Sequence, residues 1–154
     1  MDWFFDLITN ECLVAGISAW LVAQVIKAII YLIINKKFEF HRLFGDGGMP
    51  SGHSATVAAV ATMTALLFGL DSFEFAISMV LALIVGHDAM GVRREAGKQA
   101  VVLNTLIELL STPIKSELHE VKLKEFVGHT PVQVFAGGFV GLVNSLVLYF
   151  FIFK

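Results

Sequence analysis

Long apolar runs separated by short polar islands dominate the pattern of this chain. The runs cover residues 12–34, 54–70, 75–92 and 132–153. A helix needs about 20 mostly apolar residues to cross a bilayer, so the first and last runs are long enough and the middle two are marginal. The uninterrupted "LVLYFFIF" near the end lacks the polar stripe of a helix on a soluble protein. The pattern predicts an all-α integral membrane helical bundle of about four transmembrane helices in a single domain, residues 1–154. A soluble helical bundle is the alternative.

The third polar segment, residues 93–130, adds further helices to this picture. "KQAVVLNTLIELLSTPI" has the apolar spacing of a helix that ends at Pro113. It is too short and too polar at its ends for a span, so we expect it to lie at the interface or to pack inward. "SELHEVKLKEF" follows as a polar segment, which we expect to be helical at the cytoplasmic surface. One or two interfacial or cytoplasmic helices therefore accompany the spans.

Composition and charge indicate a location and an orientation. Apolar residues make up 56% of the chain, against ~45–50% in soluble domains. The net charge of −2 gives no reason to expect nucleic acid as a partner. Nine of the eleven Lys and Arg residues lie in the first and third loops, whereas Lys154 lies at the far end and Lys27 inside a span. Loops rich in Lys and Arg stay in the cytoplasm. We therefore expect a multi-pass protein of the cell membrane, with both termini outside.

The amino-terminal part carries two weaker signals. No Lys or Arg precedes Lys27, so we expect no cleavable signal peptide. Cys12 is the only cysteine, so no disulfide can form within the chain.

The first polar island is "GGMPSGHSA", residues 47–55. Gly, Pro and Ser before an apolar run are typical of a loop that feeds a helix, with Ser51 or Ser54 as the N-cap. Backbone N–H groups at a helix start bind anions, and glycines let the backbone approach a phosphate closely. The alternative is a simple helix cap beside an incidental His53.

The second island, "GHDAMGVRREAGKQA", spans residues 86–100 at the end of the third run. Arg93 and Arg94 could bind phosphate oxygens in a bidentate manner, with Lys98 nearby. The alternative is a cluster that only anchors the cytoplasmic end of a span. Asp88 argues against that alternative, because an acid beside the bilayer usually has a partner.

The third island, "GHTPVQVFAGG", again precedes a span and places Gln133 one helical turn after His129. Lys27 lies about eight residues, or ~12 Å, from the first loop. It either extends to the interface or points inward to a bound anion. Two histidines, several cations and a glycine-rich loop at one membrane face are typical of phosphoryl transfer. The competing chemistry is a metal site that would use His53, His87, Asp88 and His129.

The three islands, in this order, resemble the motifs of the type 2 phosphatidic acid phosphatase superfamily, to which the vanadium haloperoxidases also belong. "MPSGHSA" is similar to its P-S-G-H motif, and "GHTPVQVFAGGFVG" to its final motif. The match is best with the small divergent branch of membrane proteins and covers residues 24–141.

The resemblance implies a role for each matching residue. His129 would be the nucleophile that forms a phosphohistidine. His53 would be the general acid and later the base. Ser51 and the Gly52 amide would hold phosphate oxygens. The mechanism implied needs no metal or other cofactor.

The chain departs from the superfamily at three places. The first motif, a lysine followed seven residues later by Arg-Pro, is absent, and Lys27, Lys37 or Arg42 could replace its lysine. Leu123 stands where an arginine usually precedes the nucleophile, and Arg93 or Arg94 could replace that arginine. Gln133 stands where an aspartate usually orients the nucleophile, with Asp88 as the nearest candidate acid.

These observations predict a phosphatase that acts on a lipid phosphate monoester or diphosphate, with membrane lipids around it and its site facing the cytoplasm. The alternative is a protein that binds or moves a phosphate-bearing lipid without hydrolysis. A homodimer is a further hypothesis, because Gly137, Gly138 and Gly141 permit close helix approach.

Overall fold

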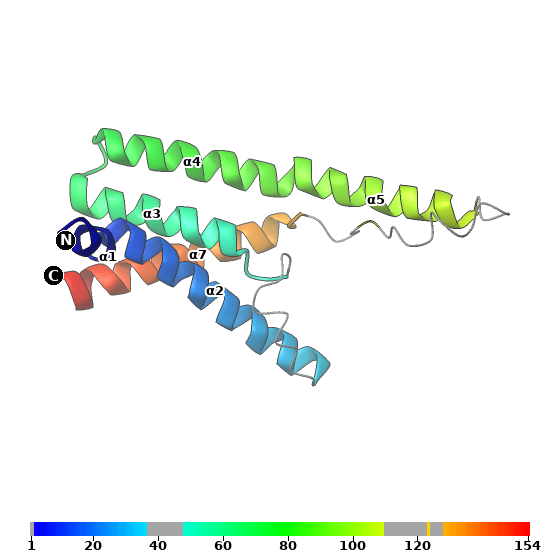
Figure 1. The fold of residues 1–154 in the computed structure, drawn as a ribbon, viewed down its shortest axis with the longest axis horizontal. Coiled ribbons are helices and arrows are strands. Elements are labelled where there is room, and N and C mark those ends of the chain that lie inside the picture. The colour runs from blue at the N-terminus through cyan, green and yellow to red at the C-terminus, as the bar shows by residue number, and fades with distance from the viewer. Residues whose placement is uncertain (1, 37–47, 110–122, 124–127) are drawn as a thin grey trace.

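The structure, a computed structural model, describes residues 2–36, 48–109, 123 and 128–154 (Figure 1). These residues form helices and no strand. The helices are α1 (Asp2–Ile8), α2 (Glu11–Asn35), α3 (Gly52–Phe68), α4 (Phe73–Met90), α5 (Val92–Leu109) and α7 (Pro131–Leu148), which ends in the π-helical turn η2 (Tyr149–Phe153). The prediction of an all-α membrane bundle is confirmed.

Each of the four main helices begins at a polar side chain that accepts a hydrogen bond from the backbone of its first turn. These N-caps are Asn10 for α2, Ser51 for α3, Ser72 for α4 and Thr130 for α7. Such caps satisfy N–H groups that have no partner within the helix. The cap at Asn10 also explains why α1, which the apolar pattern did not predict, is a separate short helix.

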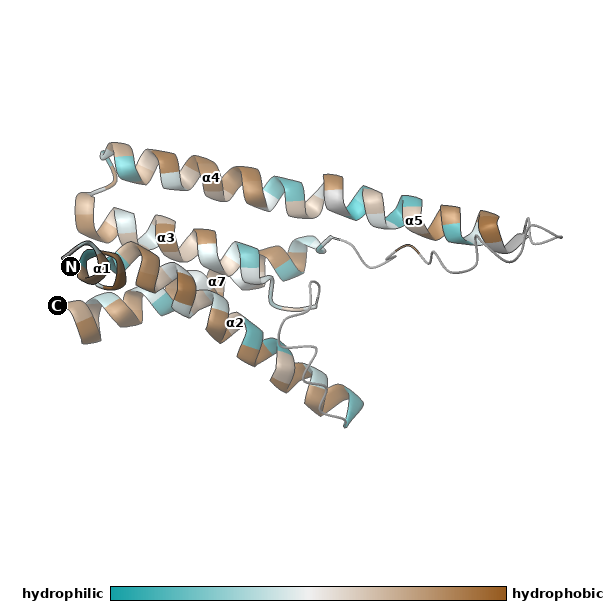
Figure 2. Ribbon diagram, viewed as in Figure 1, coloured by the Kyte–Doolittle hydropathy of each residue, from teal (hydrophilic) through white to brown (hydrophobic). Residues whose placement is uncertain are grey.

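Helices α2, α3, α4 and α7 run alternately in opposite directions, and both termini lie at the same end (Figure 1). Helix α3 is central, since it packs against each of the other three. In the described part of the chain, three helical stretches are long and apolar enough to span a membrane: Glu11–Asn35, Phe73–Ile107 and Pro131–Phe153. Helix α3, with 17 residues, is shorter. Hydrophobic residues cover most of α2, α4 and α7 (Figure 2), and many of them, such as Leu83 and Phe139, are exposed on the outside.

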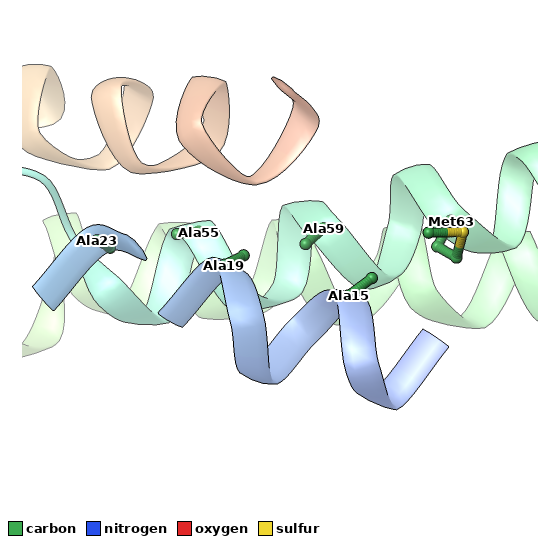
Figure 3. Packing of buried hydrophobic residues seen from close by; sticks show 6 residues of the cluster. All are labelled: Ala15, Ala19, Ala23, Ala55, Ala59 and Met63. Carbon is green, nitrogen blue, oxygen red and sulfur yellow. The ribbon is translucent and has the colours of Figure 1, made fainter. Parts of the chain in front are cut away.

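The buried centre of the bundle is built mainly from alanine. Ala15, Ala19 and Ala23 repeat every fourth residue on α2 and face Ala55 and Ala59 on α3 (Figure 3). Small side chains let two backbones approach closely, so that van der Waals contact holds them together where lipid provides no hydrophobic driving force.

Two glycines that we considered for a homodimer are used within the chain instead. A Cβ atom on Gly137 would overlap the carbonyl oxygen of Ser51, and one on Gly141 would overlap that of Ala55. Both glycines therefore let α7 pack closely against α3, whereas Gly138 has open space beside it. The homodimer itself stays a prediction, and Gly137 and Gly141 are not available to form its interface.

The helix that we expected over the segment "KQAVVLNTLIELLSTPI" begins earlier than expected, and of the two locations that we gave for it, the interface stays a prediction. Helix α5 starts at Val92, separated from α4 by Gly91 alone, and extends beyond the bundle in the direction of α4 (Figure 1). The expectation that it packs inward is wrong, because little between the two helices redirects the chain: the Gly91 N–H still bonds the His87 carbonyl. Pro113 and most of the "SELHEVKLKEF" segment fall outside the described residues.

Candidate functional site

The first turns of α3 and α7 lie side by side at one end of the bundle. The backbone N–H of Ser51 donates to the carbonyl of Gln133 at 3.0 Å. One turn further along α7, Gly137 contacts the Ser51 carbonyl, which only a residue without a side chain permits. Both helices thus present their amino-terminal ends at the same place. Helix amino termini carry partial positive charge and favour anions.

His129 is buried directly before α7, with 7% of its surface exposed. Its backbone N–H donates to the carbonyl of Ala89, the penultimate residue of α4, at 3.0 Å. Its Nδ1 lies 3.3 Å from Oε1 of Gln133. An amide oxygen only accepts, so in the neutral imidazole this bond places the proton on Nδ1 and the lone pair on Nε2.

The same Gln133 oxygen also belongs to a capping box. It accepts from the Thr130 N–H at 3.0 Å, while the Thr130 hydroxyl accepts from the Gln133 N–H at 3.4 Å. This reciprocal arrangement closes the first turn of α7. One side chain thus starts the helix and orients the imidazole.

Ser51 is fully buried, and it is the N-cap of α3, as one of our two candidates predicted. Its Oγ lies 3.3 Å from the N–H of Ser54, from which it accepts, and 3.0 Å from the hydroxyl of Ser54. Gly52 follows as the first residue of the helix, and a Cβ there would lie 3.1 Å from Cδ1 of Trp20. The absence of a side chain at Gly52 therefore lets α2 approach the start of α3.

Lys27 turns inward under the loop that precedes Ser51. Its side chain is 8% exposed, and the position of a Cβ on Gly48 lies 3.3 Å from its Cγ and 3.9 Å from its Cε. Gly48 has a φ of 86°, a conformation that favours glycine. One turn earlier on the same helix, Gln24 is also 8% exposed. These two polar side chains of α2 therefore lie beside the described end of the glycine-rich loop, near Gly48 and Gly52.

The remaining predicted residues lie at this end of the bundle but not all at its centre. His53 is exposed on the first turn of α3, and Asp88 is half-buried in the last turn of α4, next to the carbonyl that His129 bonds. Arg94 is exposed at the start of α5, and only the backbone of Arg93 is described. Lys98 is exposed and bonds Glu95 on its own helix at 2.6 Å, so the structure does not bring it to the site. Lys37 and Arg42 fall outside the described residues.

The alternative metal site does not assemble. Within residues 2–36, 48–109, 123 and 128–154, no three side chains of His, Cys, Asp or Glu come close enough together to hold a metal ion. The four residues that this alternative would use are therefore not gathered into one cluster.

Sequence reasoning missed two features of the site. The first is Gln24, whose spacing from Lys27 puts both residues on one helix face. The second is the capping box, although the letters "TPVQ" carry its Thr-x-x-Gln signature.

Comparison with known proteins agrees with the architecture and the motif order. The sequence profile of the divergent PAP2 family matches residues 8–144. The chain is 44% identical over 155 residues to the uncharacterized membrane protein YuiD of Bacillus subtilis (strain 168), an alignment that covers 95% of this chain and 98% of that protein. No solved structure is significantly similar to the chain. The chain therefore belongs to the divergent PAP2 family of membrane proteins.

Proposed function

We propose that this protein hydrolyses a lipid phosphate monoester or diphosphate at the cytoplasmic face of the cell membrane, with His129 as nucleophile. The observation that carries the proposal is the environment of His129. It is buried, hydrogen-bonded through Nδ1 to Gln133, and placed where α3 and α7 begin. A phosphate at this point would meet two helix amino termini and the Lys27 side chain.

The chemistry follows in two steps. Nε2 of His129 attacks phosphorus, the bond from phosphorus to the lipid oxygen breaks, and His53 gives its proton to the leaving oxygen. Water then attacks the phosphohistidine while His53 takes a proton from it. The P–N bond breaks, and inorganic phosphate leaves with His129 restored. The exposure of His53 suits exchange of this proton with water.

Phosphate release tests the proposal. Purified full-length protein in detergent micelles is incubated with dioleoyl phosphatidic acid and, separately, a polyprenyl diphosphate, in excess chelator. We expect release of inorganic phosphate, inhibition by vanadate, and loss of turnover in His129→Ala. The exposed His87 provides the matched control, and His87→Ala should retain turnover. Release that stops in chelator and returns with a divalent ion, or that persists in His129→Ala, would contradict the proposal.

A second function is favoured by one observation. The residue that orients His129 is a neutral amide, which offers no negative charge to an imidazole that becomes positive during attack. The same group of residues could therefore bind or move a phosphate-bearing lipid without hydrolysis. Binding of phosphatidic acid with no phosphate release under any condition would favour this second function.

A further inference from the structure

A stripe of residues with polar atoms runs along one face of α2. Trp20, Gln24 and Lys27 occupy positions i, i+4 and i+7, which share a helix face. The position of a Cβ on Gly52 lies 3.4 Å from Nε1 of Trp20 and 3.9 Å from Nε2 of Gln24. The stripe therefore faces the first residue of α3, where the phosphate site begins. Polar residues inside a membrane-spanning helix are costly, and they mark functional positions.

Gln24 is the member of this stripe that the fold does not explain. Only 8% of the Gln24 surface is exposed, so the residue is more than nine-tenths buried, and its Oε1 is shielded from solvent. Within the described part of the chain, Oε1 accepts no hydrogen bond. A buried acceptor without a donor destabilises the folded protein. A leucine of similar size would avoid this cost, so packing alone gives no reason for glutamine here.

The missing partner has a definite chemistry. An amide oxygen binds only a hydrogen-bond donor. The neighbouring groups, the Lys27 ammonium and the first backbone N–H groups of α3, are themselves donors and suit anionic oxygens. The ligand that completes this set presents negative oxygens to the donors and a hydroxyl to Gln24. A phosphate monoester below its second pKa of about 6 has both, since it keeps one P–OH group. A phosphodiester has no such group on phosphorus.

We propose that Gln24 is a specificity-determining residue of the phosphate site, which accepts a hydrogen bond from a hydroxyl of the ligand headgroup and so selects phosphate monoesters over phosphodiesters. The inference rests on the proposed function for the location of the phosphate. Most membrane phospholipids are diesters, so a lipid phosphatase needs this discrimination. The donor that gives this selection is the P–OH group itself, because an alcohol next to the phosphate is also present in some diesters, and a glycerol ester tests that alternative source.

Trp20 provides the readout. Because Oε1 of Gln24 is shielded in this structure, a ligand hydroxyl reaches it only when a neighbouring side chain moves, and Trp20 is its neighbour at Gly52. The chain has two tryptophans, so a Trp3→Phe background leaves Trp20 as the single indole fluorophore. Its emission then reports binding without any need for turnover.

The experiment titrates this full-length protein in phosphatidylcholine nanodiscs at pH 5.5. The ligands are the phosphonate analogue of dioleoyl phosphatidic acid, which cannot be hydrolysed, its monomethyl ester and its glycerol monoester. All three carry one negative charge, and the methyl ester has no hydroxyl. We expect the parent to bind the free phosphonate about tenfold more tightly than the methyl ester. A glycerol ester as weak as the methyl ester assigns the donor to P–OH, whereas one as tight as the free phosphonate shows that an alcohol suffices and overturns the selection against diesters.

The variant Gln24→Leu should bind the three ligands with equal affinity. Its thermal unfolding midpoint should equal or exceed that of the parent, because the unsatisfied oxygen is gone. Thr64→Val is the matched control, since it removes a buried hydroxyl that bonds Ser78 at 2.8 Å between α3 and α4. We expect this control to keep the parent's selectivity.

Several outcomes would overturn the proposal: equal affinities in the parent, unchanged selectivity in Gln24→Leu, a lower unfolding midpoint in that variant, or no binding at all. Its failure is distinguishable from failure of the proposed function. Gln24-dependent selectivity without phosphate release refutes hydrolysis alone. Phosphate release by a parent whose selectivity survives Gln24→Leu refutes the role of Gln24 alone.

Discussion

At the scale of single residues, the oxygen of Gln133 has two tasks that a carboxylate would perform differently. It accepts from the Thr130 N–H at 3.0 Å and from Nδ1 of His129 at 3.3 Å. The first bond shapes the start of α7, and the longer second bond orients the imidazole. A carboxylate would make both bonds and would also stabilise the positive charge on His129. The amide therefore keeps the geometry of the site and lacks the charge.

Substitution of Gln133 separates these tasks. Gln133→Leu loses both bonds, and since a hydrogen bond to a charged group contributes ~1.5–3 kcal/mol, turnover should fall roughly ten- to a hundred-fold. Gln133→Glu restores the usual capping-box acid and should preserve or raise turnover, with tolerance to Asp88→Asn in that background. Thr130→Ala is the control, because it removes the cap hydroxyl and leaves the amide oxygen in place. Phosphate release measures turnover, and normal turnover in Gln133→Leu would reopen the choice of nucleophile.

Lys27 offers a second prediction at this scale. Lys27 is 8% exposed, so loss of a contact with a phosphate oxygen should weaken lipid phosphate binding by ~1.5–3 kcal/mol. We therefore expect Lys27→Met to bind dioleoyl phosphatidic acid at least tenfold more weakly in a nanodisc titration. Lys36→Asn, at the exposed end of α2, should bind like the parent. Parent-like affinity in Lys27→Met would show that this lysine only completes the packing against Gly48.

At the scale of elements, the site depends on how closely α7 approaches α3. Gly137 and Gly141 are one turn apart and contact the carbonyls of Ser51 and Ala55. Ser145, one turn later, donates from its hydroxyl to the carbonyl of Ala59 at 2.8 Å. The two helices are therefore in close contact at three successive positions of α7. This contact fixes His129 relative to Ser51, because both residues lie at the ends of the paired helices.

Two glycines on α7, Gly141 and Gly138, test this packing. In Gly141→Ala the new Cβ would lie 2.8 Å from the backbone nitrogen of Ala59, and even closer to the Ala55 carbonyl oxygen, so the helices must separate. We expect a loss of ~1–3 kcal/mol in the free energy of unfolding, together with reduced phosphate release. Gly138→Ala is the matched control, since no atom lies within 4 Å of its Cβ position. Its stability should be unchanged or higher by up to about 1 kcal/mol. Equal destabilisation of both variants in thermal unfolding would contradict the close α3–α7 contact.

Sequence patterns predicted the helical elements better than their ends and partners. The apolar runs and the cap at Ser51 reflect local physics, so these helices can be predicted from the sequence, and the Thr130 capping box could have been predicted in the same way. Long-range packing decides which helix face meets which neighbour. For this reason the sequence did not show that Gly137 and Gly141 contact α3 within the chain instead of a second copy. Gln24 was missed for the same reason, because its position next to the start of α3 is visible only in the folded structure.

At the scale of the whole molecule, the bundle has two unlike ends. Both termini and the turn between α3 and α4 lie at one end, and the starts of α3 and α7 lie at the other (Figure 1). Helix α5, which carries Arg94 and Lys98, continues from the site end. An even number of crossings follows if all four main helices span the bilayer. The basic residues of α5 then decide which end faces the cytoplasm.

Cysteine labelling tests this orientation. Because loops rich in Lys and Arg remain in the cytoplasm, we predict that the site end faces inward. In a Cys12→Ala background, Lys98→Cys on α5 should be protected from a membrane-impermeant thiol reagent added to intact cells, and should react once the cells are permeabilised. Asp71→Cys, in the exposed turn between α3 and α4, should react in intact cells. The two positions serve as controls for each other, since each is exposed on the folded protein and they lie at opposite ends. Reaction of Lys98→Cys from outside, with protection of Asp71→Cys, would invert the protein and place phosphate release on the outer face. Reaction of both would mean that α4, which lies between the two positions, does not cross the membrane.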